Sequence, residues 1–174
     1  VYTSVVVPED FSTNITFTEL LWVQYAGMGN AVVSLNDNNT NHIEVAAGQN
    51  VRASGKYDIF TTGVTLSNLD IPNSNSEGKG AFLYFGKTLD KNAPCTAGDD
   101  AISLLIEKKT DGIAFSLINS NGVKGLIGTV AKADVYNISF SLIQKSRTLK
   151  VNDTEFKLDK LIGENSSLAG QDII

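Results

Sequence analysis

The residue types that catalyse reactions or bind transition metals are scarce in this chain. His42 is the only histidine and Cys95 is the only cysteine. A Ser-His-Asp or Cys-His site would therefore have a single candidate base, and neither a multi-histidine zinc site nor a thiolate cluster can be assembled. One cysteine also excludes an internal disulfide. We expect that the protein is not an enzyme.

The carboxylates are spread along the chain. Glu44, Glu77 and Glu107 are separated by long intervals, and the adjacent Asp99 and Asp100 would point to opposite faces of a strand. Hydrolysis of a sugar bond needs two carboxylates within about 5 to 10 Å of each other. Such a pair could form only if the fold brings together carboxylates that are far apart in the sequence.

Strands must position whatever chemistry the chain carries. Short runs rich in Val, Ile, Phe, Tyr and Thr are separated by clusters of Gly, Asn, Ser and Asp, and their period of two residues is typical of strands. The pattern predicts strands at 2–7, 15–23, 32–35, 42–45, 57–66, 81–85, 101–107, 112–118, 125–130, 136–143 and 148–151.

Helical periodicity is weak. Residues 17–25 fit either a helix or a strand that enters a loop, and residues 158–162 fit a short helical turn. The tail, 165–174, could pair as a final strand beside residues 2–7, which would protect an exposed sheet edge. Turn-forming residues predict loops at 36–41, 72–80, 92–100 and 119–122.

Length and composition are those of one soluble domain. The 174 residues are 42% hydrophobic and 19% charged, and no run approaches the roughly 18 apolar residues of a membrane helix. The net charge of −5 would repel phosphate backbones. We expect one all-β domain over residues 1–174, an antiparallel jelly-roll β-sandwich with little helix, with no nucleic-acid partner and no membrane insertion.

The order of strand patterns in the second half resembles a known family. Strand Tyr136-Asn-Ile-Ser-Phe140 is followed by a turn and by Leu149-Lys-Val-Asn152, and the runs 82–86, 101–107 and 111–117 precede them. Over about residues 57–156 this order resembles the laminin-G-like branch of the concanavalin-A-like sandwiches. The resemblance implies the jelly-roll fold and three kinds of site: a glycosidase centre, a calcium site at the rim and a sugar-binding platform.

The glycosidase and calcium sites can be compared with the residues present. Glycoside hydrolases of that fold carry a Glu-x-Asp-x-x-Glu strand, which this chain lacks. Calcium prefers carboxylate, amide and carbonyl oxygens held in a loop. Asp90, Asp99 and Asp100 are the candidate calcium ligands, and Ca²⁺ is the one cofactor that we consider. The segment 37–48 begins like a helix-loop-helix calcium loop but lacks the required Gly and Glu.

A sugar platform needs an aromatic ring for the apolar face of a pyranose and amides for its hydroxyls. Most phenylalanines, Phe82 included, occupy alternating strand positions and are interpreted as core, as is Trp22 among its apolar neighbours. The candidate ligand-binding residues are Tyr25, Tyr57 and Tyr84, with the loop amides Asn39, Asn73 and Asn75.

These patterns favour a non-catalytic, lectin-like module that binds carbohydrate or another surface ligand through its loops or its concave sheet. Abundant Asn, Ser, Thr and Gly with low charge fits a secreted or cell-surface protein. The alternative is a structural or adhesion module of a larger surface protein, whose partner is another protein. A structure decides between these and an enzyme by showing whether two carboxylates meet in a cleft.

Overall fold

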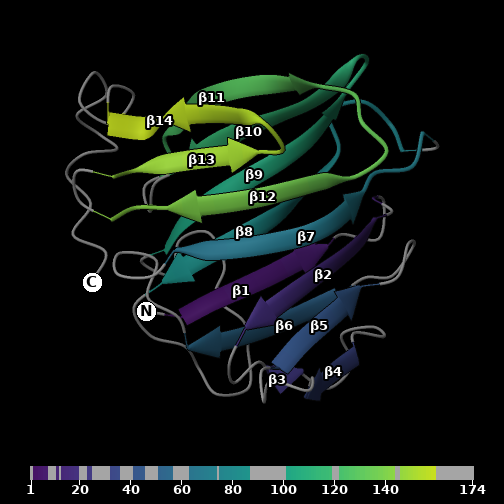
Figure 1. The fold of residues 1–174 in the computed structure, drawn as a ribbon, viewed down its shortest axis with the longest axis vertical. Coiled ribbons are helices and arrows are strands. Elements are labelled where there is room, and N and C mark those ends of the chain that lie inside the picture. The colour runs from purple at the N-terminus through teal and green to yellow at the C-terminus, as the bar shows by residue number, and fades with distance from the viewer. Residues whose placement is uncertain are drawn as a thin grey trace.

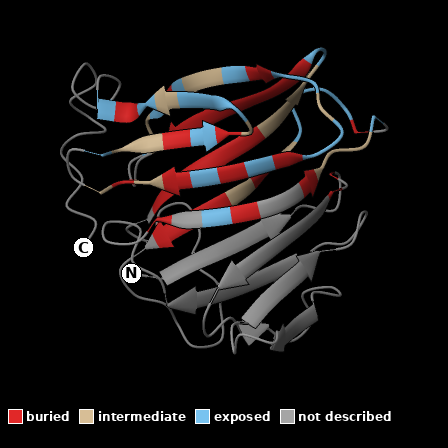
Figure 2. Cartoon of the chain, viewed as in Figure 1, coloured by how far each residue is buried: buried red, intermediate tan, exposed pale blue. Residues whose placement is uncertain are grey.

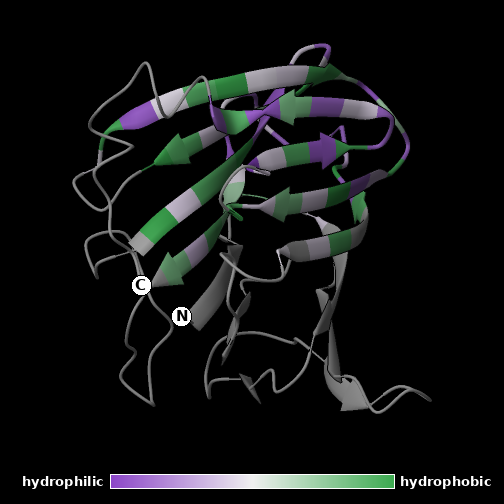
Figure 3. Cartoon of the chain, turned by 60° about the vertical axis from the view of Figure 1, so that its left-hand side comes forward, coloured by the Kyte–Doolittle hydropathy of each residue, from purple (hydrophilic) through white to green (hydrophobic). Residues whose placement is uncertain are grey.

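The computed structural model describes residues 2–7, 11, 13–19, 23–24, 32–35, 41–45, 51–56, 63–73, 75–86, 101–118, 122–143 and 146–159. This part of the chain is nearly all strand, arranged in two antiparallel sheets that form two layers (Figures 1 and 3). The prediction of an all-β sandwich is confirmed.

The described strands are β1 (Tyr2–Val7), β2 (Asn14–Glu19), β3 (Val23–Gln24), β4 (Val32–Leu35), β5 (Asn41–Val45), β6 (Val51–Lys56), β7 (Val64–Asp70), β8 (Gly80–Gly86), β9 (Ala101–Lys109), β10 (Gly112–Ile118), β11 (Lys124–Ala131), β12 (Tyr136–Ser141), β13 (Thr148–Val151) and β14 (Thr154–Lys157). Sheet A has the order β11-β10-β9-β8-β1-β6-β3, and sheet B has the order β14-β13-β12-β7-β2-β5-β4.

The core lies between the sheets because alternate side chains of each strand point inward. From sheet A, Leu83 and Phe85 of β8 and the odd-numbered apolar residues of β10 enter the core, and from sheet B, Ile138 and Phe140 of β12 do so. The rings of Phe85 and Phe140 meet across the layers with centroids 5.5 Å apart. Each such side chain contributes about 1.5–3 kcal/mol when fully buried.

The hairpin β12–β13 places its apolar residues on one face and its polar residues on the other. Ile138 pairs with Val151 and Phe140 with Leu149, and all four are buried while Asn137 and Ser139 are exposed (Figure 2). The alternation of apolar and polar residues is sufficient to fix this geometry, because a slip by one residue would turn every apolar side chain outward.

The sequence pattern does not predict two of the strands. β6 (Val-Arg-Ala-Ser-Gly-Lys) has little apolar alternation, and it is a strand because its whole length pairs with β1. β14 follows β13 after the two-residue turn Asn152-Asp153, in which Asn152 adopts a φ of 52°. An Asn-Asp pair between strand-like runs is a hairpin signal that the sequence does contain.

Three predicted segments need correction. The predicted strand 57–66 is wrong at Gly63, whose φ of 73° lies outside the β region; β7 begins after it and continues to Asp70. The predicted strand 15–23 is divided between β2 and β3, which lie in different sheets. Both are strands, so the helical alternative for 17–25 is wrong at these residues.

The predicted pairing of 165–174 with β1 is also wrong. β1 pairs with β6 on one side and with β8 on the other, so neither of its edges is open to a further strand. The tail itself lies outside the described residues. Of the predicted helical turn at 158–162, Leu158 and Asp159 are described and are helical.

On one side of the sandwich the edge strands β11 and β14 approach each other without pairing. The pairing of β10 with β11 shifts between Phe115 and Ser116, so that Ile127 is an extra residue in β11. Gly128 follows it, and an added Cβ there would lie 2.4 Å from the Phe156 ring. The absence of a side chain at 128 is what lets Phe156 cover this end of the core.

Candidate binding surface

Most of the predicted site residues lie outside the described part of the chain. These are the aromatic candidates Tyr25 and Tyr57, the amide Asn39, and all three candidate calcium ligands, Asp90, Asp99 and Asp100. Among the residues that the structure does describe, no group of three His, Cys, Asp or Glu side chains could hold a metal ion. The calcium site therefore stays a prediction.

Asn73 and Asn75 lie in the predicted loop before β8, and their main chain is held from outside the loop. The ammonium of Lys108 donates to the carbonyl of Asn73 at 2.7 Å and to the carbonyl of Asn75. Asn75 is 7% exposed and its side-chain amide donates to the carbonyl of Pro72 at 3.2 Å. Asn73 alone of the two is exposed.

Tyr84 lies on a different side of sheet A. In β8 the core residues are Ala81, Leu83 and Phe85, so Tyr84 and Phe82 point to the opposite, outer face. Their rings stack with centroids 5.5 Å apart and planes inclined by 12°. Lys108 follows the core alternation of β9, so the loop that it holds is on the core side. The structure does not bring Tyr84 together with Asn73 and Asn75.

The strand registers define the outer face of sheet A around Tyr84. One row across the strands joins Phe82, Leu105, Ser116 and Leu126, and the neighbouring row joins Tyr84, Ser103, Ile118 and Lys124. We call these eight residues, with Glu107 and Ala114 in the next row, the outer face.

The outer face is unusually apolar for the non-core side of a sheet. Leu105 is 8% exposed and Ala114 is 1% exposed, although neither belongs to the hydrophobic cluster between the sheets. On the corresponding side of sheet B, by contrast, Ser139 and Lys150 are exposed. Since a sheet with one solvated face normally places polar residues there, the outer face of sheet A differs from its counterpart in composition and in burial.

Two hydroxyl groups on this face are buried without a hydrogen-bond partner. Ser103 is 1% exposed and Ser116 is 0% exposed, and within the described structure neither Oγ makes a hydrogen bond. A buried hydroxyl that lacks a partner costs about 1–3 kcal/mol. The sequence could retain such a cost where a bound molecule supplies the missing partner.

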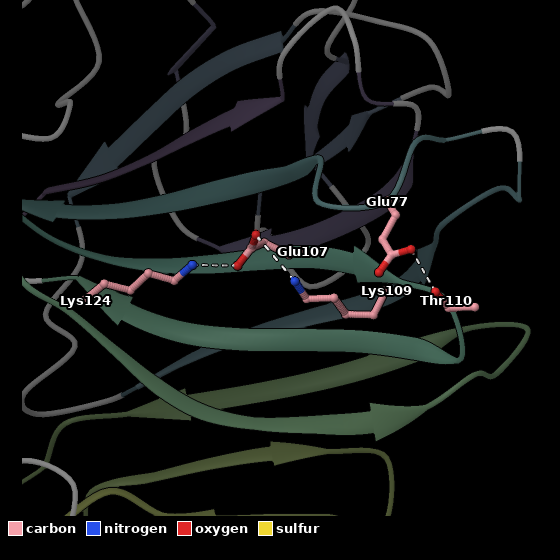
Figure 4. Close-up of polar contacts among 5 residues, drawn as sticks. All are labelled: Glu77, Glu107, Lys109, Thr110 and Lys124. Atoms are coloured by element: carbon pink, nitrogen blue, oxygen red, sulfur yellow. Dashed lines mark hydrogen bonds and ion pairs between the residues drawn. The ribbon is translucent and has the colours of Figure 1, made fainter.

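A charged cluster lies on the same face (Figure 4). Lys124 Nζ lies 2.9 Å from one oxygen of Glu107, and Lys109 Nζ lies 4.0 Å from the other. The two lysines reach the carboxylate from opposite directions. Nearby, Thr110 Oγ1 donates to Glu77 at 2.7 Å and ties the turn between β9 and β10 to the loop before β8.

Sequence reasoning misses most of the outer face. It interprets Phe82 as core, but Phe82 lies on the outer face and is only partly buried. The signal that is present is the nearly continuous apolar character of 101–106 and 112–118, each interrupted by a single serine, because a strand buried on both faces loses the apolar and polar alternation.

Glu107 of the outer face lies between two ammonium groups, and the hydroxyls of Ser103 and Ser116 have no hydrogen-bond partner among the described residues. Comparison with protein-family models, with curated proteins and with solved structures gave no match for this chain. Within the described residues, no helix is both long and apolar enough to span a membrane.

Proposed function

We propose that this chain is a non-catalytic carbohydrate-binding module of the lectin-like kind and that a saccharide lies across the outer face of sheet A. The observation that carries the proposal is the row Phe82, Leu105, Ser116 and Leu126, in which apolar side chains flank a buried, unpartnered hydroxyl. A saccharide has matching chemistry, because its ring faces are apolar and its edges carry hydroxyls.

The ends of this row are accessible and its centre is covered. Phe82 is partly buried and Leu126 is 61% exposed, whereas Ser116 is fully buried. Four neighbouring strands span roughly 14 Å at the usual strand spacing, which is long enough for more than one sugar ring. A saccharide would contact Leu126 and Phe82 first and would hydrogen-bond to Ser116 once the centre opens.

The finer features expected from the sequence belong to the same proposal. They are jelly-roll connectivity, a laminin-G-like relationship, secretion or display at the cell surface, and a rim calcium at Asp90, Asp99 and Asp100. Two antiparallel sheets are compatible with the first two of these features. A saccharide ligand fits a protein displayed outside the cell, where glycans are abundant.

Binding to a glycan array tests the proposal, with two exposed apolar residues as a matched pair. Leu126→Ala removes a side chain of the outer face, and Val135→Ala removes one that is 42% exposed before β12 in the other sheet. We expect Leu126→Ala to lower the affinity for the glycans bound on the array about tenfold, equivalent to about 1.4 kcal/mol. Val135→Ala should leave that affinity unchanged. A blank array over broad panels of neutral and acidic glycans would refute the proposal.

A second candidate is a protein-interaction module. It is favoured by the position of Leu126 on β11, the edge strand of sheet A, which among the described strands pairs only with β10. Another chain could add a strand to that edge. Light scattering at rising concentration tests for self-association, and a protein that stays monomeric throughout would exclude this candidate in its homotypic form.

A further inference from the structure

The ion pair between Lys124 and Glu107 crosses sheet A at the position of Ser116. In sheet A, β10 separates β9 from β11, so the ion pair between Glu107 of β9 and Lys124 of β11 must cross the outer side of β10. Lys124 is opposite Ile118, and Glu107 is opposite Ala114. Ser116 is the outward residue between those two positions, and the lysine therefore passes over it.

This cover is held by weak forces. The side chain of Lys124 is 49% exposed, and that of Glu107 is 12% exposed. Ion pairs of lysines this exposed are screened by water and contribute little to stability. Lys124 can therefore leave Glu107 at a small cost, and the cost becomes smaller still if another anion replaces Glu107 as its partner.

The cluster also contains more positive than negative charge. Two ammonium groups, Lys124 and Lys109, face the single carboxylate of Glu107. If Lys124 leaves Glu107, the carboxylate still has Lys109, whose Nζ lies 4.0 Å away in the structure. The ammonium of Lys124 then has no carboxylate partner and lies beside the uncovered hydroxyl of Ser116. A neutral ligand would leave that ammonium without a partner, whereas a carboxylate would bind it.

We propose that the saccharide bound by the outer face is acidic, with a uronic acid whose carboxylate takes Lys124 from Glu107 while a sugar hydroxyl pairs with Ser116. The inference rests on the proposed function, since it names the ligand class of that same face. In the unliganded protein Lys124 acts as a cover, and the acidic sugar opens it.

The net charge of the chain limits the ligand to few charges. At −5 the protein repels extended polyanions, but physiological salt screens exposed charges beyond about 8 Å. A short uronic-acid oligosaccharide meets Lys124 within that distance. Heavily sulfated chains and nucleic acids are not expected to bind.

Calorimetry with tetragalacturonate and with its methyl ester tests the inference, because esterification removes the charge of the carboxyl groups and leaves the sugar rings unchanged. We expect the acid to bind at least about tenfold more tightly than the ester, equivalent to about 1.4 kcal/mol. The preference should fall as salt is raised from low concentration to about 0.5 M, since the Debye length then shrinks to a few ångströms.

Three variants test whether the preference for the acid over the ester comes from the cluster of Lys124, Lys109 and Glu107. Lys124→Gln should remove the preference for the acid, and it should bind the ester at least as tightly as the unmodified protein does, because the ester then has no Lys124–Glu107 ion pair to break. Glu107→Gln should raise affinity for the acid several-fold, because Lys124 is then no longer engaged. Lys150→Gln, on the exposed side of β13, makes the same charge change in sheet B and should have no effect. Thermal melts of all three check that each variant folds.

The possible results separate this inference from the proposed function. If acid and ester bind equally, or if Lys150→Gln weakens the acid as much as Lys124→Gln does, the inference is wrong and carbohydrate binding stands. If Glu107→Gln weakens binding of the acid, the exchange of partners is wrong. If neither tetrasaccharide binds and the glycan array is blank as well, both proposals fail.

Discussion

Replacing Ser116 by Ala should stabilise the protein, which is the opposite of what most core substitutions do. Ser116 is 0% exposed and its Oγ has no hydrogen-bond partner within the described structure. Removing an unpartnered buried hydroxyl recovers part of a cost of about 1–3 kcal/mol, and the methyl group of Ala keeps the packing around Cβ. Because the oxygen also packs against its neighbours, the recovery is incomplete, and we expect a gain of about 1 kcal/mol.

Urea unfolding measures this gain directly. With a slope of about 2 kcal/mol/M, the midpoint should rise by roughly 0.5 M while the slope is unchanged, and the melting temperature should rise by about 2–4 °C for a domain of this size. Ser139→Ala is the matched control because Ser139 is a central strand residue on the exposed side of sheet B. Its effect should stay within about 0.5 kcal/mol.

A destabilisation of about 1 kcal/mol or more, with an unchanged slope, would refute the reasoning. It would mean that the Ser116 hydroxyl has a partner in solution, such as an ordered water, and that its hydrogen bond contributes to folding. The same result would weaken the case for the outer face as a binding surface, because the missing partner would then be solvent and not a ligand.

Three further substitutions test the packing and the turn geometry of the sandwich that supports the outer face. Phe140→Ala should cost about 3–5 kcal/mol in urea unfolding, since Phe140 is 1% exposed and packs against Phe85; a cost below about 1 kcal/mol would contradict a tightly packed interface between the sheets. Gly128→Ala should cost about 1–3 kcal/mol through its 2.4 Å approach to Phe156, and the cost should shrink in a Phe156→Leu background, as a double-mutant cycle would show. Asn152→Ala should be about 1 kcal/mol less stable than Asn152→Gly, because both lose the bonds to Asn137 N and Val135 O but only Gly adopts the φ of 52° without strain; equal stabilities of the two variants would exclude a role for backbone conformation.

The position of a strand and the direction of its side chains are predictable from the sequence wherever one face of the strand is apolar and the other is polar. In β12 the order Tyr-Asn-Ile-Ser-Phe-Ser determines both the strand and the direction of every side chain, because water on one side and the core on the other leave a single acceptable register. β6 cannot be predicted in this way. Its sequence carries no such alternation, and its conformation depends on backbone hydrogen bonds to β1, a strand about fifty residues earlier in the chain.

The candidate site is less predictable than the fold. The type of residue alone identifies Tyr84 as a ligand-binding candidate, and the structure adds its stacked partner Phe82 and its burial. Asn73 and Asn75 are candidates for the same reason, but the structure places them with Lys108 at the core side of sheet A. Residue type indicates what a side chain can bind, and only the sheet register shows which side chains share a face.

The sequence by itself determined an all-β chain with one histidine, one cysteine and scattered acids. Those facts concern local periodicity and composition, which need no knowledge of distant neighbours. Only the tertiary structure decided that Lys124 crosses β10 to reach Glu107 and that Ser116 is left beneath it without a partner in the described part of the chain. The physical reason is that strand order is set by pairing between segments far apart in the sequence, so the contacts across three neighbouring strands exist only after the sheet has formed.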